Sequence, residues 1–356
     1  MSNAEDKLNS ILRKISGPDK EAGRQAEEHW LELAKPLGSL GVLEEDICRT
    51  AALTGSAKVT YRPRSVYVFC ADNGVVAQGV TQTGSEVTGI VADELAAWRT
   101  TVCHMASAAD CRVVPVDMGI KNYAGNPGVL SRRVDNGTKD LSQGPAMTRE
   151  QAATAILTGM TLAGEAKDAG QHLLATGEMG IGNTTTSSAI ASVLLNRPVE
   201  EMTGKGAGLS DEGLRRKICV IKKSIARNEP NPDDALDVLS KEGGFDIAAM
   251  CGMFLGGAYY KIPVLMDGLI SNVAALCAVR LCPNARKAIL ASHVSQEPAA
   301  KLILNELGCK PLISAGMYAG EGSGAVAAMP LLDMAEAVYS SAYTFDEGGI
   351  EPYRPC

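Results

Sequence analysis

Short apolar segments alternate with alanine-rich segments along most of the 356 residues of this chain. The apolar segments predict strands at residues 65–71, 111–117, 172–175 and 263–266, with weaker candidates at 288–292 and 311–315. The alanine-rich segments predict helices at residues 87–108, 149–167, 185–195, 213–228 and 246–259. Strands that alternate with helices form βαβ units, whose parallel sheet is covered by helices on both faces. We therefore expect an α/β fold with a Rossmann-like, mostly parallel sheet.

The two ends of the chain have helical patterns of their own. Apolar residues recur at helical spacing near the N-terminus, where residues 35–41 interrupt them, and residues 329–342 predict a helix near the C-terminus. We expect residues 60–328 to form a large α/β domain that carries the active site. Residues 1–59 and 329–356 are expected to form a small helical lobe together.

Composition and charge exclude several classes of protein. The net charge of −7 argues against a nucleic-acid partner, and an aromatic content of 4% argues against an aromatic-rich β sandwich. The ten cysteines form no C-x-x-C pair and the four histidines are dispersed, so we expect reduced cysteines, no metal and a cytoplasmic protein. Lys261, Pro263 and Asp267 interrupt the most apolar region, which argues against a membrane span, and the polar first residues predict no signal peptide.

The glycine-rich segment at residues 177–188 carries most of the functional signal. It reads Gly-Glu-Met-Gly-Ile-Gly-Asn-Thr-Thr-Thr-Ser-Ser and lies between an expected strand and an expected helix. Such a turn exposes free backbone N–H groups that suit a phosphate, although Asn183 stands where a Walker loop needs lysine. The negative charge of Glu178 would not help this loop to bind a phosphate. Its presence therefore indicates chemistry on a sugar or base beside the phosphate. A purely structural turn is the alternative interpretation.

A second carboxylate, Glu321, lies in another glycine-rich loop at residues 320–325, again before an expected helix. If both glutamates line one cleft, one of them is a candidate base and the other a candidate partner of a sugar hydroxyl. The alternative is that Glu321 only caps its helix.

A third glycine-rich segment, residues 204–212, also precedes a helix, for which Ser210 is the expected N-cap. One of Lys205, Arg215 or Lys217 is a candidate for contact with a phosphate, and ordinary surface charge is the alternative.

Six segments of the chain match, in order, the motifs of one family. They are Lys-Pro-Leu-Gly-Ser-Leu-Gly (35–41), Ala-Asp-Asn-Gly-Val (71–75), Pro-Ala-Met-Thr (145–148), Gly-Glu-Met-Gly-Ile-Gly-Asn-Thr-Thr (177–185), Gly-Gly-Phe-Asp-Ile-Ala-Ala-Met (243–250) and Gly-Glu-Gly-Ser-Gly-Ala (320–325). With this set, which covers nearly the whole chain, the sequence resembles the nicotinate-nucleotide:dimethylbenzimidazole phosphoribosyltransferases of cobamide (vitamin B12) assembly.

The resemblance implies transfer of 5-phosphoribose from nicotinate mononucleotide to an aromatic base, which gives an α-riboside phosphate and free nicotinate without a cofactor. It implies that Glu321 is the catalytic base and that Glu178, also catalytic, lies near the ribose. Gly180, Gly182 and Lys217 match phosphate-site positions. The remaining residues expected to contact substrate are Thr81, Gly84, Gly89, Met179, Asn183, Ser292, Met317 and Gly320.

Departures from the family pattern gather at the expected acceptor pocket. Asn73 stands where family members usually carry histidine, Thr81 to Gly84 replace a Ser-Ala-Tyr-Pro stretch, Gly89 replaces a glutamine and Met179 replaces a leucine. The resemblance therefore implies retained chemistry with a changed acceptor, and dimethylbenzimidazole, phenol and p-cresol stay open. Phenols are used by a heterodimeric branch of the family in some anaerobes.

Two other functions stay open at this point. The altered region at residues 81–89 fits a non-catalytic or partner subunit of a hetero-oligomeric transferase, although the retained Glu178 and Glu321 argue against it. A nucleotide-binding oxidoreductase rests only on the expected sheet, and fold analogy is weak warrant for function. We expect either a homodimer or a heterodimer with a paralogous subunit.

Overall fold

The computed structural model describes residues 4–353, and the fold class predicted from the sequence is confirmed. Its core is a six-stranded parallel sheet in the order β3-β2-β1-β4-β5-β6. The strands are β1 (Arg64–Ala71), β2 (Arg112–Gly119), β3 (Leu130–Ser131), β4 (Leu173–Met179), β5 (Val264–Met266) and β6 (Ile289–Ala291). The order reverses direction between β1 and β4, and crevices at such a point bind ligands in open α/β sheets.

Two strand predictions need correction. Residues 311–315 form no strand, because only one bridge, from Ile313 to His293, joins them to the rest of the sheet. The strand predicted at 172–175 continues to Met179, where Glu178 pairs in register with Phe69 of β1. Glu178 therefore lies on a strand and not in the turn that follows it.

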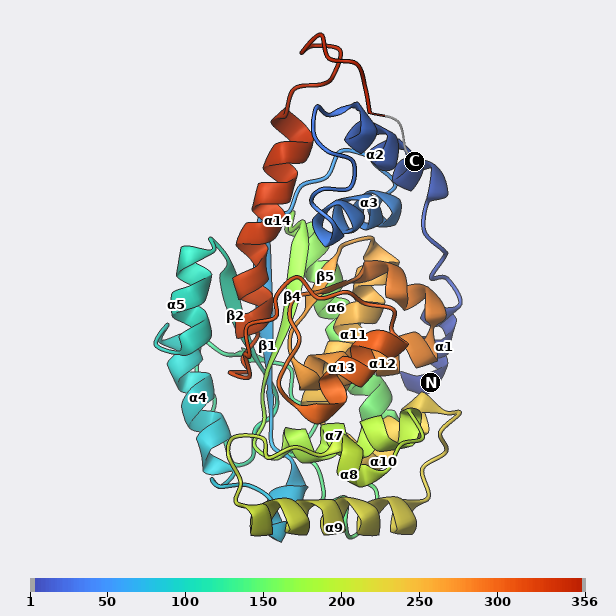
Figure 1. Ribbon diagram of the computed structural model, residues 1–356. Coiled ribbons are helices and arrows are strands. Elements are labelled where there is room, and N and C mark those ends of the chain that lie inside the picture. The colour runs from blue at the N-terminus through green and yellow to red at the C-terminus, as the bar shows by residue number, and fades with distance from the viewer. Residues whose placement is uncertain (1–3, 354–356) are drawn as a thin grey trace.

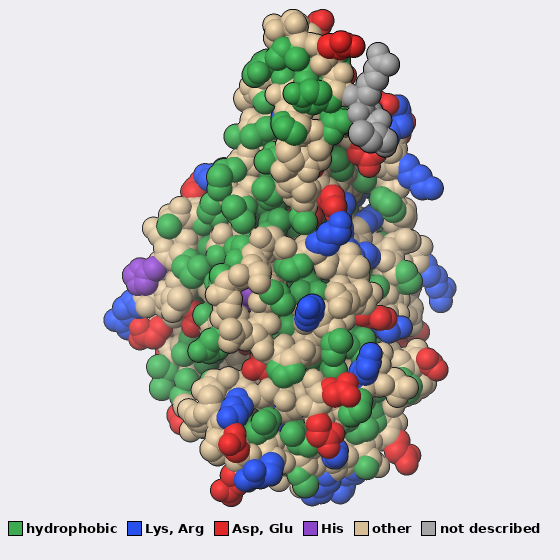
Figure 2. Space-filling view, in the orientation of Figure 1, with side chains coloured by type: hydrophobic (Ala, Val, Ile, Leu, Met, Phe, Trp, Pro, Cys, Tyr) green, Lys and Arg blue, Asp and Glu red, His purple; other side chains and the backbone are tan. Residues whose placement is uncertain are grey.

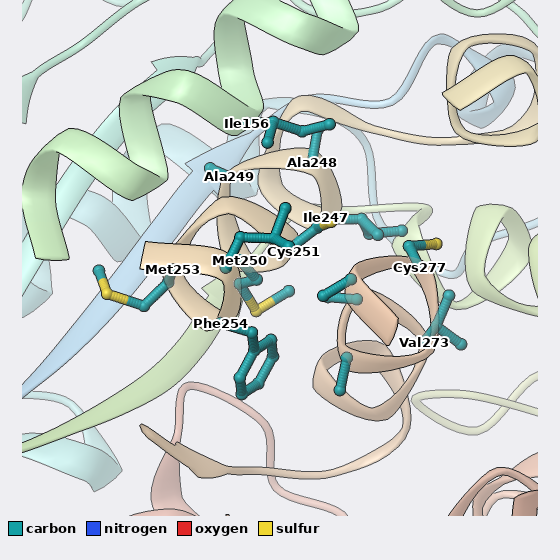
Figure 3. Packing of buried hydrophobic residues seen from close by; sticks show 14 of the residues in the cluster. Ile156, Ile247, Ala248, Ala249, Met250, Cys251, Met253, Phe254, Val273 and Cys277 are labelled. Carbon is teal, nitrogen blue, oxygen red and sulfur yellow. The ribbon is translucent and has the colours of Figure 1, made fainter. Parts of the chain in front are cut away.

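Helices cover both faces of the sheet (Figure 1). One side of the sheet packs against a cluster that includes Leu8, Ile156, Phe254 and Leu276, and part of this cluster is shown in Figure 3. The helices contributing these residues are α1 (Ala4–Leu12), α6 (Arg149–Asp168), α11 (Phe245–Tyr260) and α12 (Leu269–Leu281). Successive side chains of β1 point alternately to this cluster and to a second cluster on the other face of the sheet, because side chains alternate in direction along a strand.

The opposite face packs against a second cluster that includes Trp30, Ile47, Val102 and Met329. Its helices are α2 (Lys20–Glu32), α3 (Val42–Thr54), α4 (Glu86–Ala96), α5 (Thr101–Ala108) and α14 (Ser323–Ser341). The single helix predicted at 87–108 is thus two helices, separated where Trp98 adopts a φ of 58°.

The remaining helices lie along the carboxyl edge of the sheet or around the first cluster. They are α7 (Asn183–Leu194), α8 (Val199–Met202), α9 (Asp211–Asn228), α10 (Ala235–Glu242) and α13 (Pro298–Glu306), with 3₁₀ turns at Gly74–Gln78 and Pro283–Ala288. Ser210 caps α9 as predicted, since its side chain accepts from the Gly213 N–H at 3.1 Å. Figure 2 shows acidic and basic side chains interspersed around α9, where Arg216 pairs with Glu212 and Lys222 with Glu200.

The N-terminal and C-terminal segments contact each other, since a β-bridge joins Leu33 to Thr344. The N-terminal segment also contacts the α/β domain, because α1 packs on α6 in the first hydrophobic cluster. Helix α14 runs without interruption through the boundary predicted at residues 328/329. Residues 1–3 and 354–356 of the predicted lobe lie outside the described part of the chain. Within residues 4–353, no helix is long and apolar enough to span a membrane.

Candidate functional site

Side chains at the carboxyl ends of neighbouring strands meet at one edge of the sheet. Asn73 follows β1, Glu178 is the last but one residue of β4, Asp267 follows β5 and His293 follows β6. Because all these strands are parallel, their carboxyl ends lie on the same side, beside the switch point between β1 and β4.

Two adjoining cavities open at this edge. The first has a volume of about 170 Å³, and its wall includes the polar side chains of Thr184, Ser271, His293 and Ser295. The second has a volume of about 210 Å³, and its wall includes Val80, Thr81, Met179, Leu209 and Glu321. Residues common to both walls are Glu178, Asn183, Thr184, Ala207, Ala319 and Gly320. The cavities are therefore two compartments of one cleft, with Glu178 between them.

The Glu178 carboxyl is held by Asn183, whose Nδ2 donates to Glu178 Oε2 and, at 3.0 Å, to Asp246 Oδ2. Burial and, after it, the negative charge of Asp246 raise the pKa of Glu178 to about 8, against the lowering effect of the hydrogen bond from Asn183. Burial likewise raises the pKa of Asp246 to about 6. Near neutral pH the unliganded site therefore keeps Glu178 largely protonated, as a hydrogen-bond donor toward the cleft.

Glu321 is presented to the second cavity by an unusual turn. Its φ is 60°, between Gly320 at 74° and Gly322 at 86°, so three successive residues are left-handed. The turn lies directly against β4, because a Cβ on Gly177 would stand 2.4 Å from the Glu321 carbonyl oxygen. A left-handed backbone costs an ordinary residue roughly 1–2 kcal/mol, and such strain concentrates at functional sites.

The alternative that Glu321 only caps its own helix is not what the contacts show. Oε2 of Glu321 accepts from the backbone N–H of Val102, in the first turn of α5, at 3.4 Å. Asp267 takes the capping position instead, since its Oδ1 accepts from the Ala325 N–H of α14 at 3.0 Å. The Glu321 carboxylate thus faces the N-terminal, positive end of the α5 dipole.

Asp267 and His293 close the far side of the first cavity. Nδ1 of His293 lies 3.0 Å from the Ser292 hydroxyl oxygen and 3.9 Å from Asp267 Oδ1. Burial raises the pKa of Asp267, and the charge of His293 opposes that rise. Ser292 turns its hydroxyl away from the cleft and donates to the Met266 carbonyl at 2.6 Å.

Lys217 lies behind the wall of the first cavity. Its ammonium group donates to Thr184 Oγ1 at 2.9 Å and to the Gly204 carbonyl at 3.2 Å. Burial lowers the pKa of this amine to about 8. Glu297 holds the same loop from the other side by accepting from the Gly206 N–H at 3.0 Å. A buried amine beside a cavity-wall hydroxyl and a glycine-rich loop suits an anion.

The structure gathers most of the residues predicted for the site and places a few outside the cavity walls. Those on the walls are Thr81, Glu178, Met179, Gly180, Gly182, Asn183, Gly320 and Glu321. Those off the walls are Gly84, Gly89, Lys217, Ser292 and Met317. Gly84 packs against the side chain of Glu86, and Gly89 against Tyr123 and Ile120.

Asp246, Asp267, His293 and Glu297 were not among the residues predicted for the site. Three of them had a signal in the sequence. Asp246 lies inside the motif at residues 243–250, and Asp267 and His293 directly follow expected strands. Glu297 follows no strand or motif, and only the folded loop brings it to Gly206.

Known proteins are similar to this chain over nearly its whole length. A family model described as "Phosphoribosyltransferase" matches residues 15–350. The chain is similar to the nicotinate-nucleotide–dimethylbenzimidazole phosphoribosyltransferase of Ruminiclostridium cellulolyticum, with 44% identity over 99% of both chains. The protein of that name from Acetivibrio thermocellus is 42% identical over 98% of this chain and 99% of its own. A crystal structure of CobT from Thermus thermophilus superimposes with a TM-score of 0.89 at 39% identity, covering 94% of this chain and 100% of that one.

Proposed function

The chain belongs to the nicotinate-nucleotide–dimethylbenzimidazole phosphoribosyltransferase family, and from that premise we propose that it moves 5-phosphoribose from nicotinate mononucleotide to an aromatic acceptor. The observation that carries the proposal is the divided cleft, with Glu178 between its compartments and Glu321 on the wall of the second. The first compartment, where Gly206 and the Lys217 partner Thr184 lie on the wall, takes the phosphoribosyl group, and the second, where Glu321 lies, takes the acceptor.

Each contact then has a chemical role. Thr184, Lys217 and the backbone around Gly206 bind the phosphate, and Glu178 donates a hydrogen bond to a ribose hydroxyl. The bond from C1′ to the pyridinium nitrogen breaks, and its electron pair leaves with nicotinate. The acceptor forms the new bond to C1′ from the opposite face, while Glu321 takes the proton of its N–H or O–H group. Holding both substrates in adjoining compartments replaces a chance encounter by an oriented displacement.

Two features support an acceptor other than dimethylbenzimidazole as well. Met179, a flexible side chain that fills irregular pockets, lines the acceptor compartment. Gln82 on the same wall donates to the Gly208 carbonyl, and this bond leaves its Oε1 available to accept from the O–H or N–H group of an acceptor. We include phenol and p-cresol as acceptors, and a homodimer or a heterodimer with a paralogous chain as the assembly. We place the reaction in the cytoplasm, where the free cysteines of residues 4–353 stay reduced.

The experiment is an acceptor screen with purified protein and nicotinate mononucleotide. Dimethylbenzimidazole, adenine, phenol and p-cresol are supplied in turn, and nicotinate release and product mass are measured. We expect one or more α-riboside phosphates from the wild-type chain, and a loss of about 10²- to 10⁴-fold in kcat for Glu321→Gln. Glu306→Gln, an exposed change on α13, is the control.

The possible results separate the parts of the proposal. Undiminished turnover by Glu321→Gln would remove the base role from that residue. Turnover that requires a paralogous chain would show a partner subunit, and failure with every acceptor and with such a chain would refute the transfer activity.

A further inference from the structure

Asn183 is fixed between two carboxyl groups from different elements. It is the first residue of α7, and its Nδ2 donates to Glu178 Oε2 on β4 and to Asp246 Oδ2 on α11. An amide nitrogen carries two hydrogens, so this contact uses both of them. The orientation of Asn183, and through it that of Glu178, therefore depends on where Asp246 lies.

Asp246 itself is removed from the cleft. Its exposure is 0%, and it is absent from the walls of both cavities. It lies in the first turn of α11, directly after the Gly244 N-cap and Phe245. A side chain in this place acts on a substrate only through a neighbour.

The other oxygen of Asp246 is also in an unusual position. Within residues 4–353 neither Asp246 Oδ1 nor Asn73 Oδ1 has a hydrogen-bond partner, and both are buried. Both oxygens lie within 2.5 Å of the point where a Cβ on Gly244 would stand. A buried polar atom without a partner costs roughly 1–3 kcal/mol, so the arrangement is not one that stability alone favours.

We propose that Asp246 is a positioning residue of the transfer reaction, which acts through Asn183 to hold one oxygen of Glu178 and leave the other facing the substrate. Oε1 of Glu178 is the oxygen left for the substrate, since it lies toward Gly320, 3.1 Å from the point where a Cβ would stand there. This inference rests on the proposed function, because it assigns Asp246 a part in the same reaction.

The charges around this unit give the inference a measurable signature. Asp72 beyond β1, Cys70 on β1 and Glu178 on β4 are the titratable groups that act on Asp246 or respond to it. The charges of Asp246, Asp267 and Glu321 raise the pKa of Glu178, whereas the hydrogen bond from Asn183 lowers it. Removing one partner or the other therefore moves the titration of Glu178 in opposite directions.

The test compares Asp246→Asn with Asn183→Ala in steady-state kinetics from pH 5 to pH 10. Both variants are expected to lose about 10- to 100-fold in kcat, the range typical of residues that orient a functional group from behind. The limb of the pH profile that reports Glu178 is expected to move to lower pH in Asp246→Asn and to higher pH in Asn183→Ala. The double variant is expected to lose no more than the less active single variant.

Asp46→Asn is the matched control, since Asp46 is also a buried carboxyl but lies on α3. Circular dichroism checks the fold of each variant, and if Asp246→Asn does not fold, the shift in Asn183→Ala decides the question. Wild-type activity in Asp246→Asn, or limbs that move in the same direction, would overturn the inference. If the wild-type chain has no transfer activity, that result refutes the proposed function itself. The comparison of variants tests the role of Asp246 only when the wild-type chain is active.

Discussion

Burial has its clearest energetic consequence at Lys217. The other basic residues of α9 are exposed, whereas Lys217 is 0% exposed, and burial lowers the pKa of its amine from 10.5 to about 8. Between these two values the unfolded chain binds more protons than the folded chain, so the free energy of unfolding rises with pH. Below pH 8 the folded protein carries the full cost of a buried charge.

We therefore expect Lys217→Met to stabilise the unliganded protein at pH 7 by about 2 kcal/mol. The lowered pKa corresponds to a cost of roughly 3 kcal/mol for burying the charged amine, and the substitution removes this cost. The loss of the hydrogen bonds of Lys217 offsets about 1 kcal/mol of that gain. The gain should shrink toward pH 10.5, and the KM for nicotinate mononucleotide should rise because the phosphate loses a cation. Urea unfolding at pH 7 and pH 10 measures the first effect and initial rates the second, with the exposed Lys223→Met as control. A variant that is equally destabilised at both pH values would contradict the argument.

Residues differ in how far the sequence reveals them. Glu178 and Glu321 were predicted because each carboxylate is surrounded by glycines, a local pattern. The part played by Asp246 depends on a contact with Asn183, 63 positions away along the chain. No local sequence pattern encodes such a contact. The motif at residues 243–250 was therefore recognised from the sequence, but the contact between Asp246 and Asn183 was not.

At the scale of elements, the break between α4 and α5 shows what helical periodicity misses. Residues 87–108 were predicted as one helix because alanine-rich composition continues through them. The chain instead turns at Trp98, and Thr100 becomes the N-cap residue of α5. The new helix start places the Val102 N–H at Glu321. The Thr100–Thr101 pair was a usable N-cap signal, whereas the contact that the new helix start makes with Glu321 joins residues 219 positions apart in the sequence.

The contact between α6 and α11 is close enough to fix the position of Asp246. A Cβ on Gly252 would stand 1.9 Å from the Ile156 carbonyl oxygen, and one on Gly159 equally close to that of Ala249. Both obstacles are backbone atoms that cannot rotate away. Gly252→Ala must therefore separate the two helices and shift the N-terminus of α11.

We expect Gly252→Ala to lower the free energy of unfolding by about 1–3 kcal/mol, the usual cost of overpacking. Transferase activity should fall with it, because Asp246 moves with its helix. Guanidinium unfolding monitored by circular dichroism gives the first quantity. Gly17→Ala is the control, since nothing lies within 4 Å of a Cβ there. A stability equal to that of this control would mean that the helices separate at little cost.

At the scale of the whole molecule, the alternation of strands and helices was enough to predict a parallel sheet covered on both faces. It did not predict the order β3-β2-β1-β4-β5-β6, because that order depends on which helix packs on which face. The order matters for function, since the change of direction between β1 and β4 opens the crevice that holds Glu178. The two-residue strand β3 was missed because it is too short for a pattern.

The two hydrophobic clusters share this sheet, which has a consequence for unfolding. Val66 and Val68 of β1 belong to one cluster and Phe69 to the other, while α14 joins the C-terminal segment to the sheet. Loss of either cluster exposes the same strands. We therefore expect one cooperative transition for the whole chain, even though its ends were predicted to form a separate lobe.

Calorimetry with and without ligand tests this expectation. Nicotinate mononucleotide at 100 times its Kd should move the entire transition upward, by about 2.7 kcal/mol in the free energy of unfolding. Nicotinate riboside lacks the phosphate and should stabilise less at the same concentration. In Lys217→Met the two ligands should differ less than in the wild type, because the amine that we propose binds the phosphate is gone. Two transitions, of which only one responds to nicotinate mononucleotide, would instead show that the lobe unfolds on its own.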